Sequence, residues 1–281
     1  MVLDRLRRRL TWSGTTGAPR SANGASSLHL FWDVPEGDWV GAEANLEVVG
    51  APRVAALSFW ALQVSFTDRG RDGGGAHLGL QWFARHPGST AVNWGGYRPG
   101  GGELAGSASA LPSATGNEST RDLAWEAHQP YRLRVRRSTS TPPEGLHAWT
   151  GDVTDLTTGV TTVVRDLWAA GTHLSGPMVW SEVFARCDDP GSAVRWSGLR
   201  LVDERGATHE VASVVVNYQA VSDGGCITTD ASADDQGIVQ ATGAVRRTTQ
   251  GTRLAVPAPP AGGDPRPPAE PSAPAGPGGR P

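Results

Sequence analysis

The chain has 281 residues and a formal net charge of −3, with 37 Gly, 21 Pro and 11 Trp. A domain that binds nucleic acid through its phosphates is expected to be basic, so the charge argues against whole-protein nucleic-acid binding. No run of about 18 apolar residues is present, and the sequence therefore predicts no transmembrane helix.

The first 27 residues predict a flexible N-terminal segment. Residues 1–10 mix arginines with leucines, and residues 11–27 are rich in Gly, Ser and Thr. A secretory signal needs an apolar stretch after its arginines, and none follows here. Read literally, the sequence indicates a cytoplasmic protein, whereas a misassigned start codon would make the protein extracellular.

From residue 28 onward, apolar and polar residues alternate with the period of half-buried β-strands. The clearest runs lie at 40–48, 60–66 and 131–136. Gly, Pro, Asp and Ser separate the runs at short intervals, as turns require. Further strands are expected at 28–32, 78–82, 90–94, 145–150, 160–165, 178–185, 194–202 and 210–218.

Many short strands and one expected helical turn, at 166–170, predict an all-β fold. We expect an antiparallel, jelly-roll-like β-sandwich with disordered termini. The sandwich domain is placed at 28–222, with 223–256 as a C-terminal extension of it. Residues 257–281 are rich in Pro and Gly and predict a disordered tail, because such a segment buries little apolar surface.

The two cysteines, Cys187 and Cys226, lie in polar, turn-like surroundings. A disulfide between them fits an exported protein, and two free buried thiols fit the sequence equally well. Neither cysteine belongs to a CxxC motif or to a metal-ligand spacing.

Tryptophan is unusually frequent among the aromatic residues, which favours a carbohydrate-binding surface, since sugar rings stack on aromatic planes. Trp94 and Tyr97 flank two glycines and are the better surface candidates, and Trp149 is the third candidate for ligand binding. The alternative for each is the core, because a strand tryptophan that alternates with polar residues usually points inward.

Two acidic residues, Glu182 and Glu103, are the candidates for catalysis. Glu182 lies between Trp180 and Phe184 in strand alternation, so a buried carboxylate there needs a partner. A structural ion pair with an arginine is the alternative. Glycosidases need two carboxylates beside the scissile bond, and the E-x-D-x-x-E spacing of the lectin-like hydrolases is absent. No residue is therefore assigned as catalytic.

No cofactor is expected, and no metal site is assigned. Carboxylates in loops suit a structural calcium ion, although a plain turn explains each of them as well. The loop acids concerned are Asp152, Asp188 and Asp189. Three alternating arginines predict a basic strip on one sheet face, most simply a solvated one, and these are Arg132, Arg134 and Arg136.

Several segments, in this order, resemble a family of uncharacterised bacterial proteins, often secreted. They read FWALQVSF, AHLGLQWF, AVNWGGY, GGGELAG, PYRLRVRR, LHAWTGDVTDLTTG and VWSEVFARCDD and cover roughly residues 30–205. The family is expected to adopt the concanavalin A-like lectin/glucanase sandwich. The resemblance implies export and points to Gln81, Trp94, Glu103, Tyr131–Val135, Trp149 and Glu182. The loop at Glu103 departs from the family's Gly-Glu-Gly pattern.

These observations lead to one main functional hypothesis and two alternatives. The main hypothesis is a non-catalytic carbohydrate-binding or surface-interaction module whose partner is a polysaccharide or glycan. The first alternative is a glycan-cleaving hydrolase or lyase that uses Glu182, Glu103 or both. The second is a structural protein without a small ligand. The main hypothesis depends on analogy between folds more than on a defined site.

Overall fold

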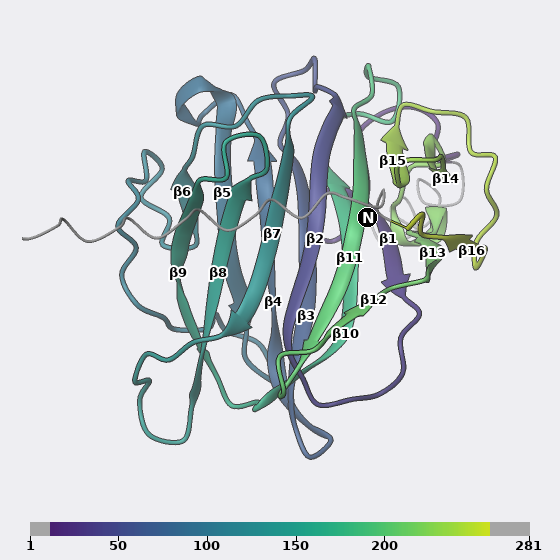
Figure 1. The fold of residues 1–281 in the computed structure, drawn as a ribbon. Helices are drawn as coiled ribbons and strands as arrows, with labels where there is room; N and C mark the ends of the chain where they lie inside the picture. Colours follow the sequence, from purple (N-terminus) through teal and green to yellow (C-terminus); the bar gives the residue numbers. More distant parts are fainter. Residues whose placement is uncertain (1–11, 259–281) are drawn as a thin grey trace, which may run out of the picture.

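The computed structural model describes residues 12–258, which fold as a sandwich of antiparallel β-sheets (Figure 1). The predicted all-β class is confirmed, and within the described residues helix is limited to two short 3₁₀ turns, η1 (Pro87–Ser89) and η2 (Val221–Asp223). The strands are β1 (Ser26–Trp32), β2 (Trp39–Gly50), β3 (Ser58–Asp68), β4 (Arg71–Trp82), β5 (Thr90–Tyr97), β6 (Thr120–Asp122), β7 (Pro130–Arg137), β8 (His147–Asp155), β9 (Thr161–Ala169), β10 (His173–Val183), β11 (Ala193–Asp203), β12 (Thr208–Glu210), β13 (Ser213–Tyr218), β14 (Thr229–Ala233), β15 (Ile238–Thr242) and β16 (Arg253–Ala255).

Two layers make up the sandwich. Sheet A has the strand order β13-β1-β10-β3-β4-β5-β6, and sheet B has the order β9-β8-β7-β2-β11-β15-β14. A single residue pair, Leu174 with Trp39, joins β10 to β2 and so links the layers. In Figure 1, β9, β8, β7, β2 and β11 lie nearer to the viewer than β5, β4, β3 and β10.

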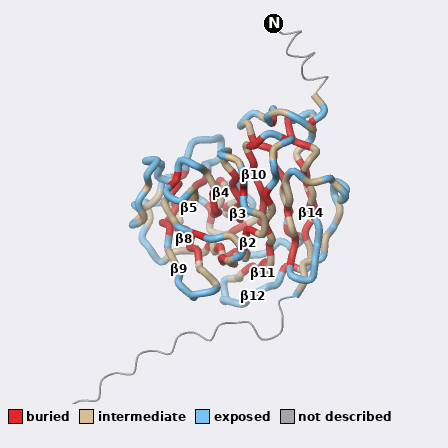
Figure 2. The backbone as a smooth tube through the Cα atoms, turned by 90° about the horizontal axis from the view of Figure 1, so that it is seen from above, coloured by how far each residue is buried: buried red, intermediate tan, exposed pale blue. Residues whose placement is uncertain are grey.

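The core lies between the sheets and consists of the inward side chains of the alternating strands. Figure 2 shows the buried residues gathered in the middle of the molecule. Such alternation buries every second residue of a strand and leaves the others on the outer face. The largest fully buried side chains are Trp60, Trp94, Trp149 and Trp196.

Two local predictions are corrected by the structure. Residues 166–170 do not form a helical turn, because Asp166 to Ala169 continue β9 and pair with β8. Asp152 is not a loop acid, because it belongs to β8. In each case pairing with a neighbouring strand decides the conformation, and a short window of sequence does not contain that partner.

The described part of the N-terminal segment, residues 12–25, is bonded to the domain, and β1 begins at Ser26, two residues before the predicted boundary. The amide of Cys187 donates to the carbonyl of Gly17, and the amide of Ile227 donates to the carbonyl of Gly14. At the other end, β14 pairs with β15, β15 pairs with β11, and β16 pairs with β13. The strands of the expected extension are therefore hydrogen-bonded to the sandwich. The tail predicted at 257–281 lies almost wholly outside the described residues.

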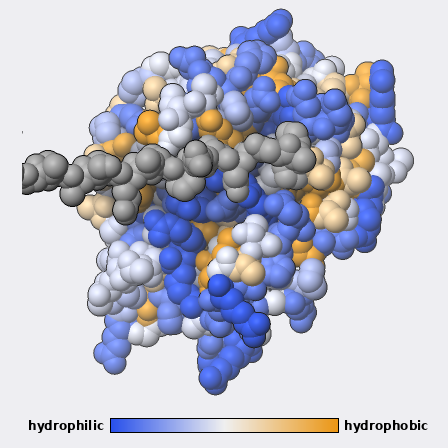
Figure 3. Space-filling model, viewed as in Figure 1, coloured by the Kyte–Doolittle hydropathy of each residue, from blue (hydrophilic) through white to orange (hydrophobic). Residues whose placement is uncertain are grey.

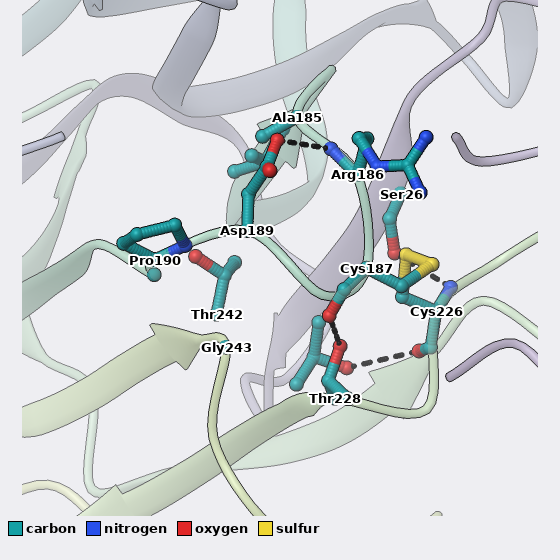
Figure 4. Close-up of a pocket in the computed structure, with 13 residues that line it drawn as sticks. Ser26, Ala185, Arg186, Cys187, Asp189, Pro190, Cys226, Thr228, Thr242 and Gly243 are labelled. Carbon is teal, nitrogen blue, oxygen red and sulfur yellow. Dashed lines mark hydrogen bonds between the residues drawn. A yellow bond between two sulfur atoms is a disulfide. The ribbon is translucent and has the colours of Figure 1, made fainter. Parts of the chain in front are cut away.

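Cys187 and Cys226 form a disulfide, which resolves the alternatives left open by the sequence (Figure 4). Their Cα atoms lie 5.4 Å apart. The bond joins the loop after β10 to the loop before β14. A small cavity of about 20 Å³ beside it is lined by Ser26, Thr228 and Thr242 among others. This volume accommodates about one water molecule and therefore no organic ligand.

The outer face of sheet B carries the predicted arginine strip, and Figure 3 shows hydrophilic surface over much of it. The strip is paired with acids. Asp152 is fully buried and accepts hydrogen bonds from Nε and Nη2 of Arg134 and from Nε of Arg136. Arg132 lies 3.8 Å from Glu43. Buried charges require such partners, so the arginines of this face form ion pairs and are not a free basic strip.

The described chain contains no helix long and apolar enough to span a bilayer.

Candidate functional site

The outer face of sheet A is the other large surface of the sandwich, and it combines aromatic, amide and acidic side chains. On β3, Phe59, Ala61 and Gln63 alternate with core residues and therefore point outward. Phe59 and Ala61 form with Trp180 of β10 a small apolar cluster that is separate from the core. We call Phe59, Ala61 and Trp180 the outer-face cluster.

Glu182 lies on β10 beside this cluster. It pairs with Phe59 of β3 on one side and with Ser27 of β1 on the other. Its Oε1 accepts hydrogen bonds from Ser27 Oγ at 3.2 Å and from Asn23 Nδ2 at 3.1 Å. Its Oε2 accepts none from the described residues. Among residues 12–258, no arginine forms an ion pair with Glu182, which was the alternative interpretation of this acid.

The environment of Glu182 favours its neutral form. Burial raises the pKa of the Glu182 carboxyl above the ordinary value of 4.5, and the hydrogen bonds from Ser27 and Asn23 oppose that rise. A raised pKa brings a carboxyl closer to the range in which a side chain both accepts and donates a proton. Glu182 is therefore a candidate general acid–base.

An open pocket of about 600 Å³ lies between β1, β13 and the segment after β15, and it reaches Glu182 only through Ser27, which lines it and donates to Glu182. Ser27, His29 and Asn217 line it. This volume is in the range of small-ligand sites. Asn217 Oδ1 accepts a hydrogen bond from Gln250, so its Nδ2 group remains available to a ligand. Burial lowers the pKa of His29, which keeps the ring neutral.

Gln63 is a second polar group on the same face. Trp180 Nε1 donates to Gln63 Oε1 at 2.9 Å, which fixes the orientation of the amide. Its Nε2 group has no partner among the described residues. Gln63 pairs with Met178, four residues before Glu182, so the two positions are separated by roughly 13 Å along the strand.

His77 completes the aromatic surround of Gln63. Its ring lies 5.5 Å from Phe59, 5.7 Å from Trp180 and 6.4 Å from Tyr97, measured between centroids. Burial lowers the pKa of His77 to about 4. The ring is therefore uncharged at neutral pH and presents an apolar edge.

Glu103, the other predicted acid, does not approach Glu182. Its backbone bridges Tyr97 beyond β5, and its side chain is exposed. β5 lies three strands from β10 in sheet A, a separation of roughly 14 Å before any offset along the strands. This exceeds the roughly 9.5 Å limit for paired carboxylates in glycosidases.

The three predicted ligand-binding aromatics occupy different environments. Trp94 and Trp149 are both 0% exposed and lie in the core. A ring without an accessible face cannot stack on a sugar, so this expectation is corrected for both. Tyr97 is 57% exposed at the end of β5, beside His77.

The predicted calcium ligands are occupied by protein donors. Asp152 is held by two arginines, and Asp188 accepts from the amide of Gly17 and from Arg186. Asp189 accepts from the amide of Arg186. Within residues 12–258, no cluster of three or more His, Cys, Asp or Glu side chains is arranged to hold a metal ion.

Gln63, His29 and Asn23 are functional candidates that the sequence pattern did not indicate. Gln63 was recognisable as an outward residue of an alternating strand. Its fixed orientation depends on Trp180, which is 117 residues away. Asn23 lies in a segment predicted to be flexible, so nothing in the sequence indicated its contact with Glu182.

No family model matches the sequence, and no curated protein matches it. Solved structures with a similar arrangement of strands include scytalido-glutamic peptidase with a peptide-based transition-state analogue. That chain is 12% identical with a TM-score of 0.42, and the match covers 81% of this chain and 99% of that one. Another is SCP-B, a member of the eqolisin family of peptidases, in complex with the tripeptide Ala-Ile-His, with the same identity and coverage and a TM-score of 0.40.

The main functional hypothesis is corrected, because most of the aromatic residues on which it depended are not accessible to a sugar. Two of the three aromatics expected to bind sugar lie in the core. A non-catalytic carbohydrate-binding module with a glycan partner is no longer supported. What holds from the suspected resemblance is the β-sandwich itself.

Proposed function

We propose that the protein is a hydrolase of acyl bonds, with extended polypeptides as its substrates and Glu182 as its general acid–base. The observation that carries this proposal is the state of the Glu182 carboxyl. One oxygen is anchored by Ser27 and Asn23, the other has no partner among the described residues, and Ser27 also lines a pocket of about 600 Å³.

The number of carboxylates favours acyl over glycosidic bonds. Hydrolysis of a glycosidic bond needs two acids within about 5 to 9.5 Å. Glu182 is the only acid among the outward residues of β1, β3 and β10 described above. Glu103 lies beyond β5, and Asp223, which lines the pocket, belongs to η2 and makes no contact with Glu182 among the described hydrogen bonds. Hydrolysis of an acyl bond needs one acid–base and hydrogen-bond donors for the carbonyl oxygen.

The reaction uses Glu182 in two steps. The ionised carboxylate takes a proton from a water molecule while the water oxygen bonds to the carbonyl carbon. The carboxylic acid then gives this proton to the leaving nitrogen as the carbon–nitrogen bond breaks. Ser27 and Asn23 hold Oε1 throughout, and the free Nδ2 group of Asn217 is a donor for the substrate.

The outer-face cluster supports an extended chain as the substrate. An extended peptide rises about 3.3 Å per residue, so roughly four residues span the distance from Glu182 to Gln63. Gln63 Nε2 is a neutral donor that suits a backbone carbonyl, and Phe59 and Trp180 offer apolar contacts to side chains between the two points.

The test is hydrolysis of an unfolded protein substrate by the full chain over a range of mildly acidic pH. We expect activity that falls as the pH drops through the raised pKa of Glu182, because the base must be ionised. Glu182→Gln should lower the rate by roughly 100-fold or more. Glu103→Gln is the matched control and should leave it unchanged. Equal rates for wild type and Glu182→Gln, or hydrolysis of polysaccharides alone, would contradict the proposal.

A further inference from the structure

We propose that the Cys187–Cys226 disulfide positions Asn23 on Glu182 by holding residues 12–25 in place, and that reduction of this bond switches the site off. We call residues 12–25 the N-terminal strap. The inference rests on the proposed function of Glu182, but it concerns how the site is assembled and controlled.

The strap is attached at the two loops that the disulfide joins. The amide of Cys187 donates to Gly17 at 2.8 Å, and the amide of Gly17 donates to Asp188 Oδ1 at 2.9 Å. On the other loop, the amide of Ile227 donates to Gly14 at 2.9 Å. These three bonds involve a cysteine of the disulfide or a residue next to one. A further bond, from the amide of Arg20 to the carbonyl of Gly224 at 2.9 Å, lies two residues from Cys226 on the same loop.

The same loops reach β1, which carries the second donor to Glu182. The amide of Cys226 donates to Ser26 Oγ at 2.9 Å, and Ser26 precedes Ser27 (Figure 4). Thr228 Oγ1 donates to the carbonyl of Cys187 at 2.7 Å, which adds a direct link between the loops. The disulfide is their only covalent cross-link within residues 12–258.

Hydrogen bonds hold the side-chain amide of Asn23 in one orientation. Its Oδ1 accepts hydrogen bonds from the amide of Ala25 at 3.1 Å and from Ser21 Oγ at 2.9 Å. This fixes the amide so that Nδ2 donates to Glu182 Oε1. Asn23 is thus a positioning residue, and it keeps its place only while the strap is attached. The nearest titratable side chain on the outer face of the neighbouring strand is His29 of β1, which pairs with Trp180, two residues before Glu182.

Reduction removes the covalent part of this attachment. A dithiol such as dithiothreitol attacks one sulfur, and the mixed disulfide that forms is resolved by the second thiol of the reagent. Cys187 and Cys226 each gain a hydrogen, and the dithiol becomes a cyclic disulfide. The two loops are then joined only by hydrogen bonds between partly exposed segments, and such segments open most readily in a folded protein.

The experiment follows the Glu182 carboxyl by NMR titration in the full chain, before and after reduction. In the oxidised protein, Asn23→Ala should move the Glu182 midpoint upward, because the ionised form loses a donor. In the reduced protein, the same substitution should leave the midpoint unchanged, because the donor has already withdrawn. Ser13→Ala, elsewhere in the strap, is the matched control and should have no effect in either state.

Asp188→Ala provides a second measurement that leaves the disulfide intact. It removes the acceptor for Gly17, so it should shift the Glu182 midpoint in the same direction as Asn23→Ala, and the two shifts should not add. Equal effects of Asn23→Ala in the oxidised and reduced proteins, or no effect in the oxidised protein, would overturn the inference.

Hydrolysis assays separate this inference from the proposed function. If the midpoints respond as described and no peptide is cleaved, the strap stands and the hydrolase proposal fails. If cleavage depends on Glu182 but is unchanged by reduction, the hydrolase stands and the strap fails. If both hold, reduction should lower the rate by roughly tenfold or more, within the range of acid–base contributions.

Discussion

The ring of Trp94 in sheet A lies against the backbone of Gly151 in sheet B, where a Cβ atom would come within 2.7 Å of Trp94 Cγ. At this point the indole ring of Trp94 fills the space that a side chain at position 151 would occupy, so the two sheets pack directly against each other. This pairing is the physical reason that Trp94 belongs to the core.

Replacing Gly151 with alanine should destabilise the protein by about 1 to 3 kcal/mol, because a side chain is forced into a packed interface. Urea unfolding followed by tryptophan fluorescence measures this change. The smaller side chain of Trp94→Leu should relieve part of the clash, so the double variant should lose less stability than the sum of the two single variants. Simple additivity would show that the contact is not the cause.

At the ion pairs of Asp152, the protein should lose more stability when the arginines are replaced than when the aspartate is replaced. Replacing both Arg134 and Arg136 with glutamine leaves a fully buried carboxylate without a counter-charge and should cost about 3 to 5 kcal/mol. Asp152→Asn should cost less, since the arginines are partly exposed to water. Thermal unfolding at neutral pH compares them, and a larger loss for Asp152→Asn would contradict this account.

Glu182 should make stability depend on pH. Its pKa is higher in the folded protein than the unfolded value of 4.5, so the folded state binds the proton more tightly. Its contribution to stability is complete below the unfolded value and is lost as the pH rises through the folded value. Glu182→Gln should therefore be more stable than wild type near pH 7 and equal to it at about pH 3.5. If the difference in unfolding free energy between wild type and Glu182→Gln did not change with pH, this would argue against a buried, ionisable Glu182.

His77 should make stability depend on pH in the opposite direction. Its pKa falls from 6.5 to about 4 on folding, so the unfolded chain binds the proton more tightly. Stability should drop as the pH falls from about 6.5 to about 4, by up to roughly 3 kcal/mol. His77→Phe should remove this step from a series of urea titrations. His147→Phe, at a β8 position outside the aromatic surround, is the control and should retain it.

The strands were predictable because their signal is local. The alternation at 40–48, 60–66 and 131–136 is produced by burial of one face, and β2, β3 and β7 occupy these segments. The environments of individual residues were not predictable, since they depend on residues that are distant in the sequence. Glycines beside Trp94 suggested a surface ring, yet Gly95 is glycine because a Cβ there would lie 2.8 Å from Ser119.

The candidate site was predictable only in part. The alternation of Trp180 and Glu182 on one strand placed both on the same face, as β10 has them. The donors to Glu182 come from Asn23 and Ser27, which are 159 and 155 residues away. Contacts over such distances leave no periodic trace in a single sequence.

The position of β1 also has a consequence for biosynthesis. This strand is made first among the strands, yet it lies between β10 and β13, whose residues follow it by about 150 and 190 positions. It must remain unpaired while most of the polypeptide leaves the ribosome, and loop closure over such lengths slows folding. Its exposed backbone is a template for wrong pairing during that time, so nascent chains of this protein are expected to need a chaperone until β13 has emerged.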